Sequence, residues 1–230
     1  MATQGMGTGA QPFSEGRLDL NNGRLLGGRL PQRPVEQEIR VVDVERLFKE
    51  SGAMLEGHFL LTSGRHSPVY WEKFRLLEQP SRLEQLCHLM VEHFSAHKIE
   101  LVAGPTLGGA IIAFEMARQL GVRAAFAERG SSGRTFRRGL GVNKGERVLV
   151  VDDVLTTGGS VAEVIAAVKQ LGGQVIGVGV LVDRSEGQTN LGIPLYSCHR
   201  AQAISYPADS CPLCQSGIPL VKLGGDKAAS

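Results

Sequence analysis

The sequence predicts an α/β protein with a mainly parallel central sheet flanked by helices and a small N-terminal, or hood, region. Apolar runs of strand length alternate with segments whose apolar residues recur at helical spacing, which is typical of strand–helix–strand units. Residues 148–151 contain no polar side chain, as expected for a parallel strand that is buried on both faces. The 230 residues, of which 42% are hydrophobic and 21% charged, suffice for one such domain.

Composition bounds the domain organisation and the class of partner. Residues 1–38 lack apolar periodicity, so we expect a disordered or loosely attached tail, a domain at 39–224 and a C-terminal tail at 225–230. The net charge of +2 argues against a nucleic-acid partner. Without a membrane-length apolar stretch or a hydrophobic signal core, the chain is predicted to be cytoplasmic with no membrane partner. A transit peptide is a weaker alternative, because Glu15 and Asp19 interrupt the basic pattern.

The first half of the domain is predicted from apolar periodicity and capping. Residues 42–49 form an amphipathic helical pattern, and the short apolar runs at 59–61 and 69–71 predict two strands joined by a polar loop. A helix is predicted over 81–94, where Ser81 begins a capping-box pattern with a glutamate three residues later.

The second half alternates strands and helices. Strands are predicted over 99–103, 122–127, 148–151 and 174–182, and a long polar segment, 128–146, precedes the third of them. Helices are predicted over 110–120, ending at Gly121, and from Ser160 onward, where Ser160 and Glu163 form a second capping-box pattern. This alternation implies right-handed crossovers between parallel strands.

The end of the 148–151 strand carries the most informative motif. Asp152 and Asp153 follow the strand, and residues 154–160 form a turn rich in glycine and hydroxyl groups that opens a helix. The free amides of such a turn favour a phosphate, whereas the two acids need hydroxyl donors or a divalent cation between them and the anion. A phosphorylated ribose satisfies both requirements. The competing interpretation is a plain buried strand followed by an ordinary capped helix.

Other phosphate motifs are excluded or weak. No G-x-x-x-x-G-K-[ST] pattern occurs, which disfavours a Walker-type triphosphatase. Gly177 and Gly179 lie inside an apolar run without a third glycine, so they are a poor dinucleotide fingerprint.

Several segments together resemble a known family. The Asp152–Ser160 motif resembles the signature of type I phosphoribosyltransferases, which bind phosphoribosyl pyrophosphate. Residues 52–71, with the S-G-R-x-S-P core at 63–68, resemble the N-terminal region of orotate phosphoribosyltransferases. Residues 181–187 resemble that family's segment whose arginine meets the orotate carboxylate, and 211–222 are similar to the ending of some bacterial and archaeal members.

The resemblance implies a type I phosphoribosyltransferase fold and a defined reaction. The phosphoribosyl group of 5-phosphoribosyl 1-pyrophosphate is transferred to orotate, which gives orotidine 5'-monophosphate and pyrophosphate in pyrimidine biosynthesis. Mg²⁺ is the implied cofactor, and a homodimer with loops exchanged between sites is the implied assembly. Asp152 and Asp153 are the implied catalytic pair on the ribose hydroxyls. The full implied set for phosphoribosyl pyrophosphate is Asp152, Asp153, Val154, Leu155, Thr156, Thr157, Gly158, Gly159, Ser160, Arg129 and Arg137.

Orotate is implied to contact Thr156, Arg184, Tyr70 and Trp71. The planar fork of Arg184 matches a carboxylate at two points, which a neutral base does not offer. The competing interpretations are a surface ion pair of Arg184 with Asp183 and ordinary core packing of the two aromatic residues.

The chain also departs from the better-known family pattern. Gly108 and Thr62 stand where that pattern has lysines, and no histidine occurs between His97 and His199. The sequence leaves open which cation of the 130–144 loop replaces them; the candidates are Arg129, Arg134, Arg137, Arg138 and Lys144. The glycine-rich turn 104–109 is a further possible pyrophosphate contact, and Lys73 and Arg75 receive no role.

The four cysteines do not make a disulfide scaffold. Cys211 and Cys214 have metal-ligand spacing, and Cys198 with His199 is a possible second pair for zinc. We favour a reduced surface turn and assign no metal ligand.

Two alternatives to orotate transfer remain at this stage. One keeps the chemistry and changes the base to adenine or uracil, and Arg184 discriminates against it. The other is a regulator that senses phosphoribosyl pyrophosphate without turning it over, which the missing lysines and histidine keep open.

Overall fold

The computed structural model describes residues 42–131, 133–202 and 204–223. The predicted tails, 1–38 and 225–230, lie outside these residues, as do the outermost positions of the predicted domain.

A six-stranded sheet forms the centre of the domain, in the order β5-β4-β3-β6-β7-β8. Its strands are β3 (Leu101–Pro105), β4 (Arg123–Gly130), β5 (Gly133–Phe136), β6 (Arg147–Leu155), β7 (Gln174–Asp183) and β8 (Leu195–Arg200). The pairs from β4 through β8 are parallel, and β5 pairs antiparallel with β4. The predicted mainly parallel sheet is therefore confirmed.

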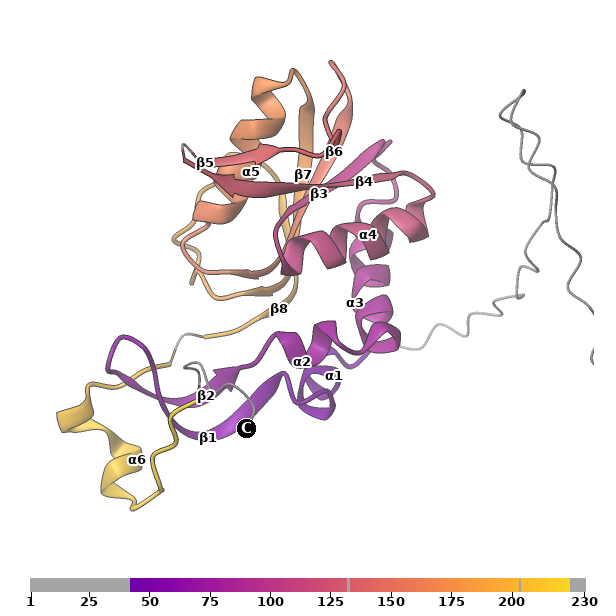
Figure 1. Ribbon diagram of the computed structural model, residues 1–230. Coiled ribbons are helices and arrows are strands. Elements are labelled where there is room, and N and C mark those ends of the chain that lie inside the picture. Colours follow the sequence, from indigo (N-terminus) through magenta and orange to yellow (C-terminus); the bar gives the residue numbers. More distant parts are fainter. Residues whose placement is uncertain (1–41, 132, 203, 224–230) are drawn as a thin grey trace, which may run out of the picture. The chain divides into compact units, whose positions relative to one another are not determined.

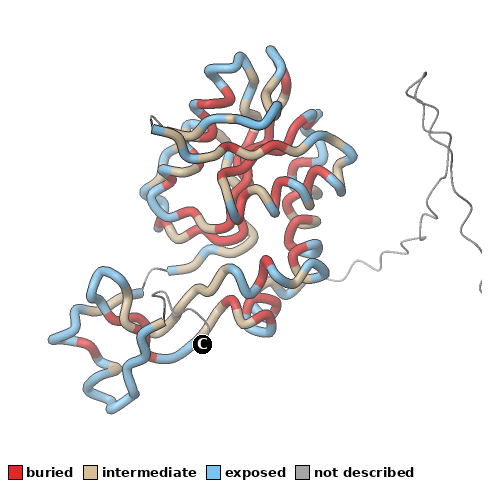
Figure 2. Tube along the Cα trace, viewed as in Figure 1, coloured by how far each residue is buried: buried red, intermediate tan, exposed pale blue. Residues whose placement is uncertain are grey.

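Helices cover both faces of this sheet (Figure 1). The helices of the described residues are α1 (Val44–Glu50), α2 (Phe74–Leu77), α3 (Pro80–His93), α4 (Gly108–Leu120), α5 (Gly159–Gln170), the 3₁₀ helix η1 (Ala208–Ser210) and α6 (Pro212–Gln215), of which α3, α4 and α5 cover the sheet. The buried residues of α3 and α4 share one core cluster with one face of the sheet, and those of α5 share a second cluster with the opposite face. Figure 2 shows the resulting buried interior of the domain. None of the described helices has the length and hydropathy that a bilayer span requires.

The pleat of β6 determines where its last residues point. Leu149 and Val151 pack in the α3–α4 core, whereas Val148 and Val150 pack in the α5 core. Because successive side chains alternate between faces, Asp152 continues the α5 side and Asp153 the α4 side.

The small N-terminal region is an antiparallel hairpin of β1 (Met54–Leu60) and β2 (His66–Trp71). Both strands begin earlier than the apolar runs predicted, because their first halves include polar residues such as Glu56 and Ser67, which the apolar pattern does not mark as strand. The C-terminal segment adds to this hairpin: Leu60 N donates to Val221 O at 2.9 Å, and His66 N donates to Tyr206 O at 2.9 Å.

Two local predictions, the capping boxes, are wrong. The N-cap of α3 is Gln79 and that of α5 is Gly158, so Ser81 and Ser160 lie inside their helices and neither predicted capping box forms. Two strands were not predicted: β5, which lies in the polar segment 128–146, and β8, which follows a loop. These two strands lie at the sheet edges, where a strand needs no long apolar run.

Candidate active site

The turn between β6 and α5 forms a small, enclosed depression of about 60 Å³. Asp152 lies on its wall together with residues 154–161. Gly158 has φ 77°, a left-handed conformation that glycine adopts without strain, and the helix starts at the next residue. The first amides of α5 therefore lie beside exposed Thr156 and Thr157, as an anion site requires.

The two buried acids have different partners. Asp153 is 4% exposed, and its carboxylate lies 2.8 Å from Lys73 Nζ and accepts the Val154 amide at 2.7 Å. Asp152 Oδ1 accepts the Asp153 amide at 2.8 Å. Burial, and next the neighbouring Asp153 charge, raise the pKa of Asp152 to about 7, against the opposing influence of the Asp153 amide, Lys73 and Arg134. Asp153 is thus the ion-paired acid, and Asp152 is the acid whose pKa is raised.

A larger pocket of about 520 Å³ adjoins the turn on the β7 side. Thr156, Thr157 and Arg184 line it together. The register of the strands brings them together, because Leu155 pairs with Asp183 and the Arg184 amide donates to Leu155 O at 2.8 Å. Arg184 Nε is buried and has no hydrogen-bond partner among the described residues, and burial lowers the pKa of this guanidinium. A buried donor without an acceptor is costly, so this side chain is suited to an anionic ligand group.

The Asp183 carboxylate does not occupy Arg184. It accepts the Ser185 amide at 2.9 Å and the Ser185 hydroxyl at 2.7 Å. The alternative interpretation of a surface Asp183–Arg184 pair is therefore wrong.

Known proteins match this arrangement. The family model "Phosphoribosyl transferase domain" matches residues 75–209. An orotate phosphoribosyltransferase of Caldanaerobacter subterraneus subsp. tengcongensis is 48% identical over 80% of this chain and 97% of its own. That of Pelotomaculum thermopropionicum is 49% identical over the same shares. The crystal structure of orotate phosphoribosyltransferase from Aeropyrum pernix matches with a TM-score of 0.55 and 34% identity, over 68% of this chain and 93% of that one.

The chain belongs to the orotate phosphoribosyltransferase family. The resemblance found in the sequence and the type I phosphoribosyltransferase fold are both confirmed.

Gly108 accounts for one departure from the better-known pattern of the orotate phosphoribosyltransferase family. A Cβ atom at this position would collide with the Asp153 carboxylate, so no lysine fits here without moving that acid. Lys73, which received no role in the sequence analysis, brings an ammonium group to the same carboxylate instead. Lys73 and Asp153 are 80 positions apart in the sequence, so no local sequence pattern predicts their contact.

Of the five candidate cations of the basic segment, the structure brings Arg134 to the start of α5, rather than Arg129 or Arg137. Arg134, on β5, is 9% exposed and points at α5, where its Nη2 lies 3.4 Å from Ser160 Oγ and its Nε 3.5 Å from Glu163 Oε2. Arg129 and Arg137 are exposed, and their role in binding phosphoribosyl pyrophosphate stays a prediction. The pairing of β5 with β4 positions Arg134. The sequence analysis did not predict β5, so it could not single out this arginine.

The two aromatic residues of β2 pack against other rings. Trp71 contacts Phe48 edge-on, with ring centroids 5.3 Å apart, and Tyr70 lies 5.7 Å from Phe59. Neither lines the pocket of Thr156 and Arg184. This packing favours the structural interpretation, and orotate contact stays a prediction for both.

Cys198 and His199 lie on β8, away from Cys211 and Cys214. Cys198 Sγ contacts Leu86 O at 3.5 Å, and the His199 ring packs on Trp71 with centroids 5.4 Å apart. Cys211 and Cys214 instead lie beside His58 and His66. The possible zinc pair of Cys198 and His199 therefore does not join Cys211 and Cys214, which lie instead beside the two histidines of the β1–β2 hairpin.

Proposed function

We propose that this protein transfers the phosphoribosyl group of 5-phosphoribosyl 1-pyrophosphate to orotate, giving orotidine 5'-monophosphate and pyrophosphate in pyrimidine biosynthesis. One observation carries the choice of base: Arg184, with its buried and unpartnered Nε, lines the same pocket as Thr156 at the edge of the phosphate turn. A carboxylate on the base would form an ion pair with that guanidinium, whereas adenine or uracil would leave it unpaired. The relatives named above carry the same activity in their names.

The turn supplies the seat for the sugar phosphate. The amides of residues 156–160 and the threonine hydroxyls hold the 5'-phosphate, and Asp152 and Asp153 accept the ribose 2- and 3-hydroxyls. Positive charge grows on the ribose as the bond to pyrophosphate breaks, and negative charge collects on the leaving group. The protein provides no nucleophile; its residues orient both substrates, and Asp152 places a carboxylate beside the developing positive charge.

The two acids also fit Mg²⁺, which prefers oxygen ligands and few protein contacts. Two carboxylates buried side by side, one of them with a raised pKa, favour a nearby divalent cation. When bound, Mg²⁺ neutralises the pyrophosphate charge. Lys73 and Arg134 supply the fixed positive charge at the same end of the sheet.

We also propose a homodimer. Leu107, Ile111 and Phe114 are 66%, 39% and 69% exposed and stand at helical spacing along α4, forming one apolar stripe. Light scattering should give twice the chain mass, and Phe114→Glu should reduce the measured mass to that of one chain. A wild-type monomer at micromolar concentration would contradict the dimer.

Cytoplasmic location stays a prediction from the sequence.

The assay that tests the function mixes pure protein, Mg²⁺, phosphoribosyl pyrophosphate and one base. Orotate absorbance should fall with stoichiometric release of pyrophosphate. Turnover with adenine or uracil but not orotate would transfer the assignment to another base. Binding of phosphoribosyl pyrophosphate without turnover of any base would identify a sensor.

A further inference from the structure

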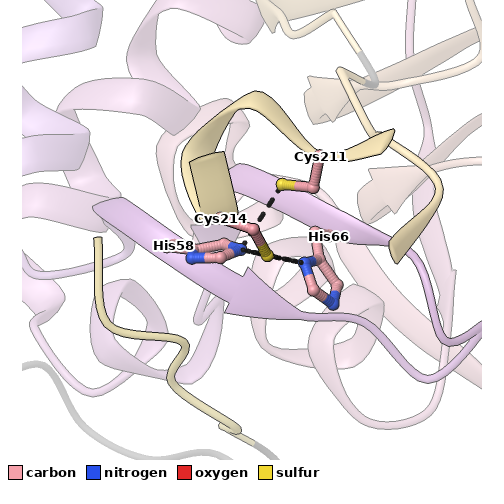
Figure 3. Close-up of side chains that lie close together, drawn as sticks. All are labelled: His58, His66, Cys211 and Cys214. Atoms are coloured by element: carbon pink, nitrogen blue, oxygen red, sulfur yellow. Dashed lines mark hydrogen bonds between the residues drawn. The ribbon is translucent and has the colours of Figure 1, made fainter. Parts of the chain in front are cut away.

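Four metal-ligating side chains meet outside the active site, between the β1–β2 hairpin and the C-terminal segment. His58, His66, Cys211 and Cys214 each direct one ligand atom into a common centre, and these atoms all lie within 4.8 Å of one another (Figure 3). The closest pairs are His58 Nε2 to His66 Nδ1 at 2.9 Å and Cys214 Sγ to His66 Nδ1 at 3.3 Å. His58 Nε2 also lies 3.5 Å from Cys211 Sγ and 3.7 Å from Cys214 Sγ.

These separations match a tetrahedral zinc site. Bond lengths of about 2.0–2.1 Å to nitrogen and about 2.3 Å to sulfur place the ligand atoms of a regular tetrahedron roughly 3.3–3.8 Å apart. The measured separations between nitrogen and sulfur, 3.3–3.7 Å, fall in that range, and the nitrogen pair at 2.9 Å needs to open by only a few tenths of an ångström.

The hydrogen bonding of His58 orients its lone pair toward the centre. Its Nδ1 lies 2.8 Å from the carbonyl oxygen of Ile218, which only accepts, so Nδ1 carries the hydrogen. In the neutral ring Nε2 is then unprotonated and faces the other three ligand atoms. In metal-bound histidines, a hydrogen bond of this kind, from the ring nitrogen that does not bind the metal to a backbone carbonyl, holds the ring in place.

The centre is buried, and the chain segments that form it are far apart in sequence. His58, His66 and Cys211 are 2%, 5% and 1% exposed, and the Cys214 thiol faces inward although the residue is exposed. The histidines come from β1 and β2, whereas Cys211 and Cys214 lie at the start of α6 and inside it. Both cysteines are free thiols.

We propose that His58, His66, Cys211 and Cys214 bind a structural zinc ion. Two nitrogen and two sulfur ligands in a tetrahedral set select zinc over the oxygen-preferring cations, and four protein ligands leave no open position for catalysis. Two thiolates and two neutral imidazoles cancel the charge of Zn²⁺, so the complete centre is neutral and suited to burial. Binding releases the two thiol protons.

The ion holds the C-terminal segment on the hairpin. An isolated two-stranded hairpin is only marginally stable, and the segment 204–221 contributes single backbone bridges to each of its edges. A zinc centre adds a fixed link between those two parts. Since β2 leads directly to Lys73, this link also positions the residue that pairs with Asp153.

The test uses the full chain, expressed with zinc and freed of any affinity tag, and measures metal by mass spectrometry. We expect about one zinc per chain, and replacement by Co²⁺ should produce thiolate charge-transfer and tetrahedral d–d bands. Cys214→Ser, at an exposed residue, should weaken zinc at least about tenfold in competition with a chelator and reduce the charge-transfer band. Cys198→Ser is the matched control and should leave both measurements unchanged.

The double variant Cys211→Ser/Cys214→Ser should contain no zinc; its circular dichroism shows whether the α/β domain remains folded. Wild-type protein without zinc and without a cobalt spectrum would overturn the proposal. Unchanged metal affinity in Cys214→Ser would overturn it as well, and that result does not depend on whether the double variant folds.

Discussion

The phosphate turn is the stretch 152–160, and the hairpin centre is the cluster of His58, His66, Cys211 and Cys214. These two sites are built in opposite ways from the same chain. Almost every group of the turn comes from one contiguous stretch, 152–160, whose strand and helix place its acids and amides. The hairpin centre takes its ligands from segments more than 140 residues apart. A contiguous site is encoded in local geometry and can be recognised in sequence, whereas a dispersed site exists only after the chain has folded.

The largest expected effect is a loss of activity toward orotate that leaves the binding of phosphoribosyl pyrophosphate nearly unchanged. Arg184→Gln should lower kcat/KM for orotate by about 10²–10³-fold, because the base carboxylate loses its charged partner in a buried pocket, while KM for phosphoribosyl pyrophosphate changes little. Steady-state kinetics with each substrate varied measures both values. Arg75→Gln, at an exposed position, is the control. Equal damage to both substrates would contradict the division of roles.

Gly108 tests whether long-range contacts complete the contiguous site. Gly108→Ala places a methyl group against the Asp153 carboxylate and should disturb its pairing with Lys73, raising KM for phosphoribosyl pyrophosphate about ten- to a hundred-fold. Gly141→Ala, where a Cβ meets nothing within 4 Å, should have no effect. Wild-type kinetics in Gly108→Ala would show that the acid moves freely.

Removal of zinc tests the hairpin centre in the way that Gly108→Ala tests the phosphate turn. Because the centre lies outside the phosphate turn, chelation should lower Tm by about 4–8 °C, which corresponds to a loss of roughly 2 kcal/mol. Differential scanning fluorimetry with and without added zinc measures this change. The same treatment of Cys211→Ser/Cys214→Ser should leave Tm unchanged, and an equal fall there would assign the effect to the chelator.

The smallest expected effect concerns Asp152 and pH. Its raised pKa means that the folded protein keeps a proton that the unfolded chain loses near pH 4, so this residue makes stability fall as pH rises from about 4 to about 7. Asp152→Asn cannot ionise and should be more stable than wild type at pH 8 by roughly 1–3 kcal/mol, with little difference at pH 4.5. Urea unfolding at both pH values measures it, with exposed Asp209→Asn as control. A pH-independent difference would exclude ionisation as the cause.

The limits of prediction follow the same division. The buried strands β3, β4, β6 and β7, the crossover helices and the turn at 152–160 could be predicted, because burial and helical periodicity are local patterns. Lys73 was given no role because its contact depends on how β2 is placed, and Arg134 could not be chosen among the five candidate cations because β5 was not predicted. His58 and His66 were missed because the hairpin pairing sets their approach to the cysteines. The capping boxes failed since Pro80 and Gly158 start those helices without a side-chain cap.

A crystal structure with orotidine 5'-monophosphate tests the central claim most directly. The account predicts the 5'-phosphate on the amides of 156–160, the ribose hydroxyls on Asp152 and Asp153, and the orotate carboxylate on Arg184. The nucleotide bound instead in the neighbouring cavity of about 760 Å³ beside Arg200, with the turn free of phosphate, would contradict it.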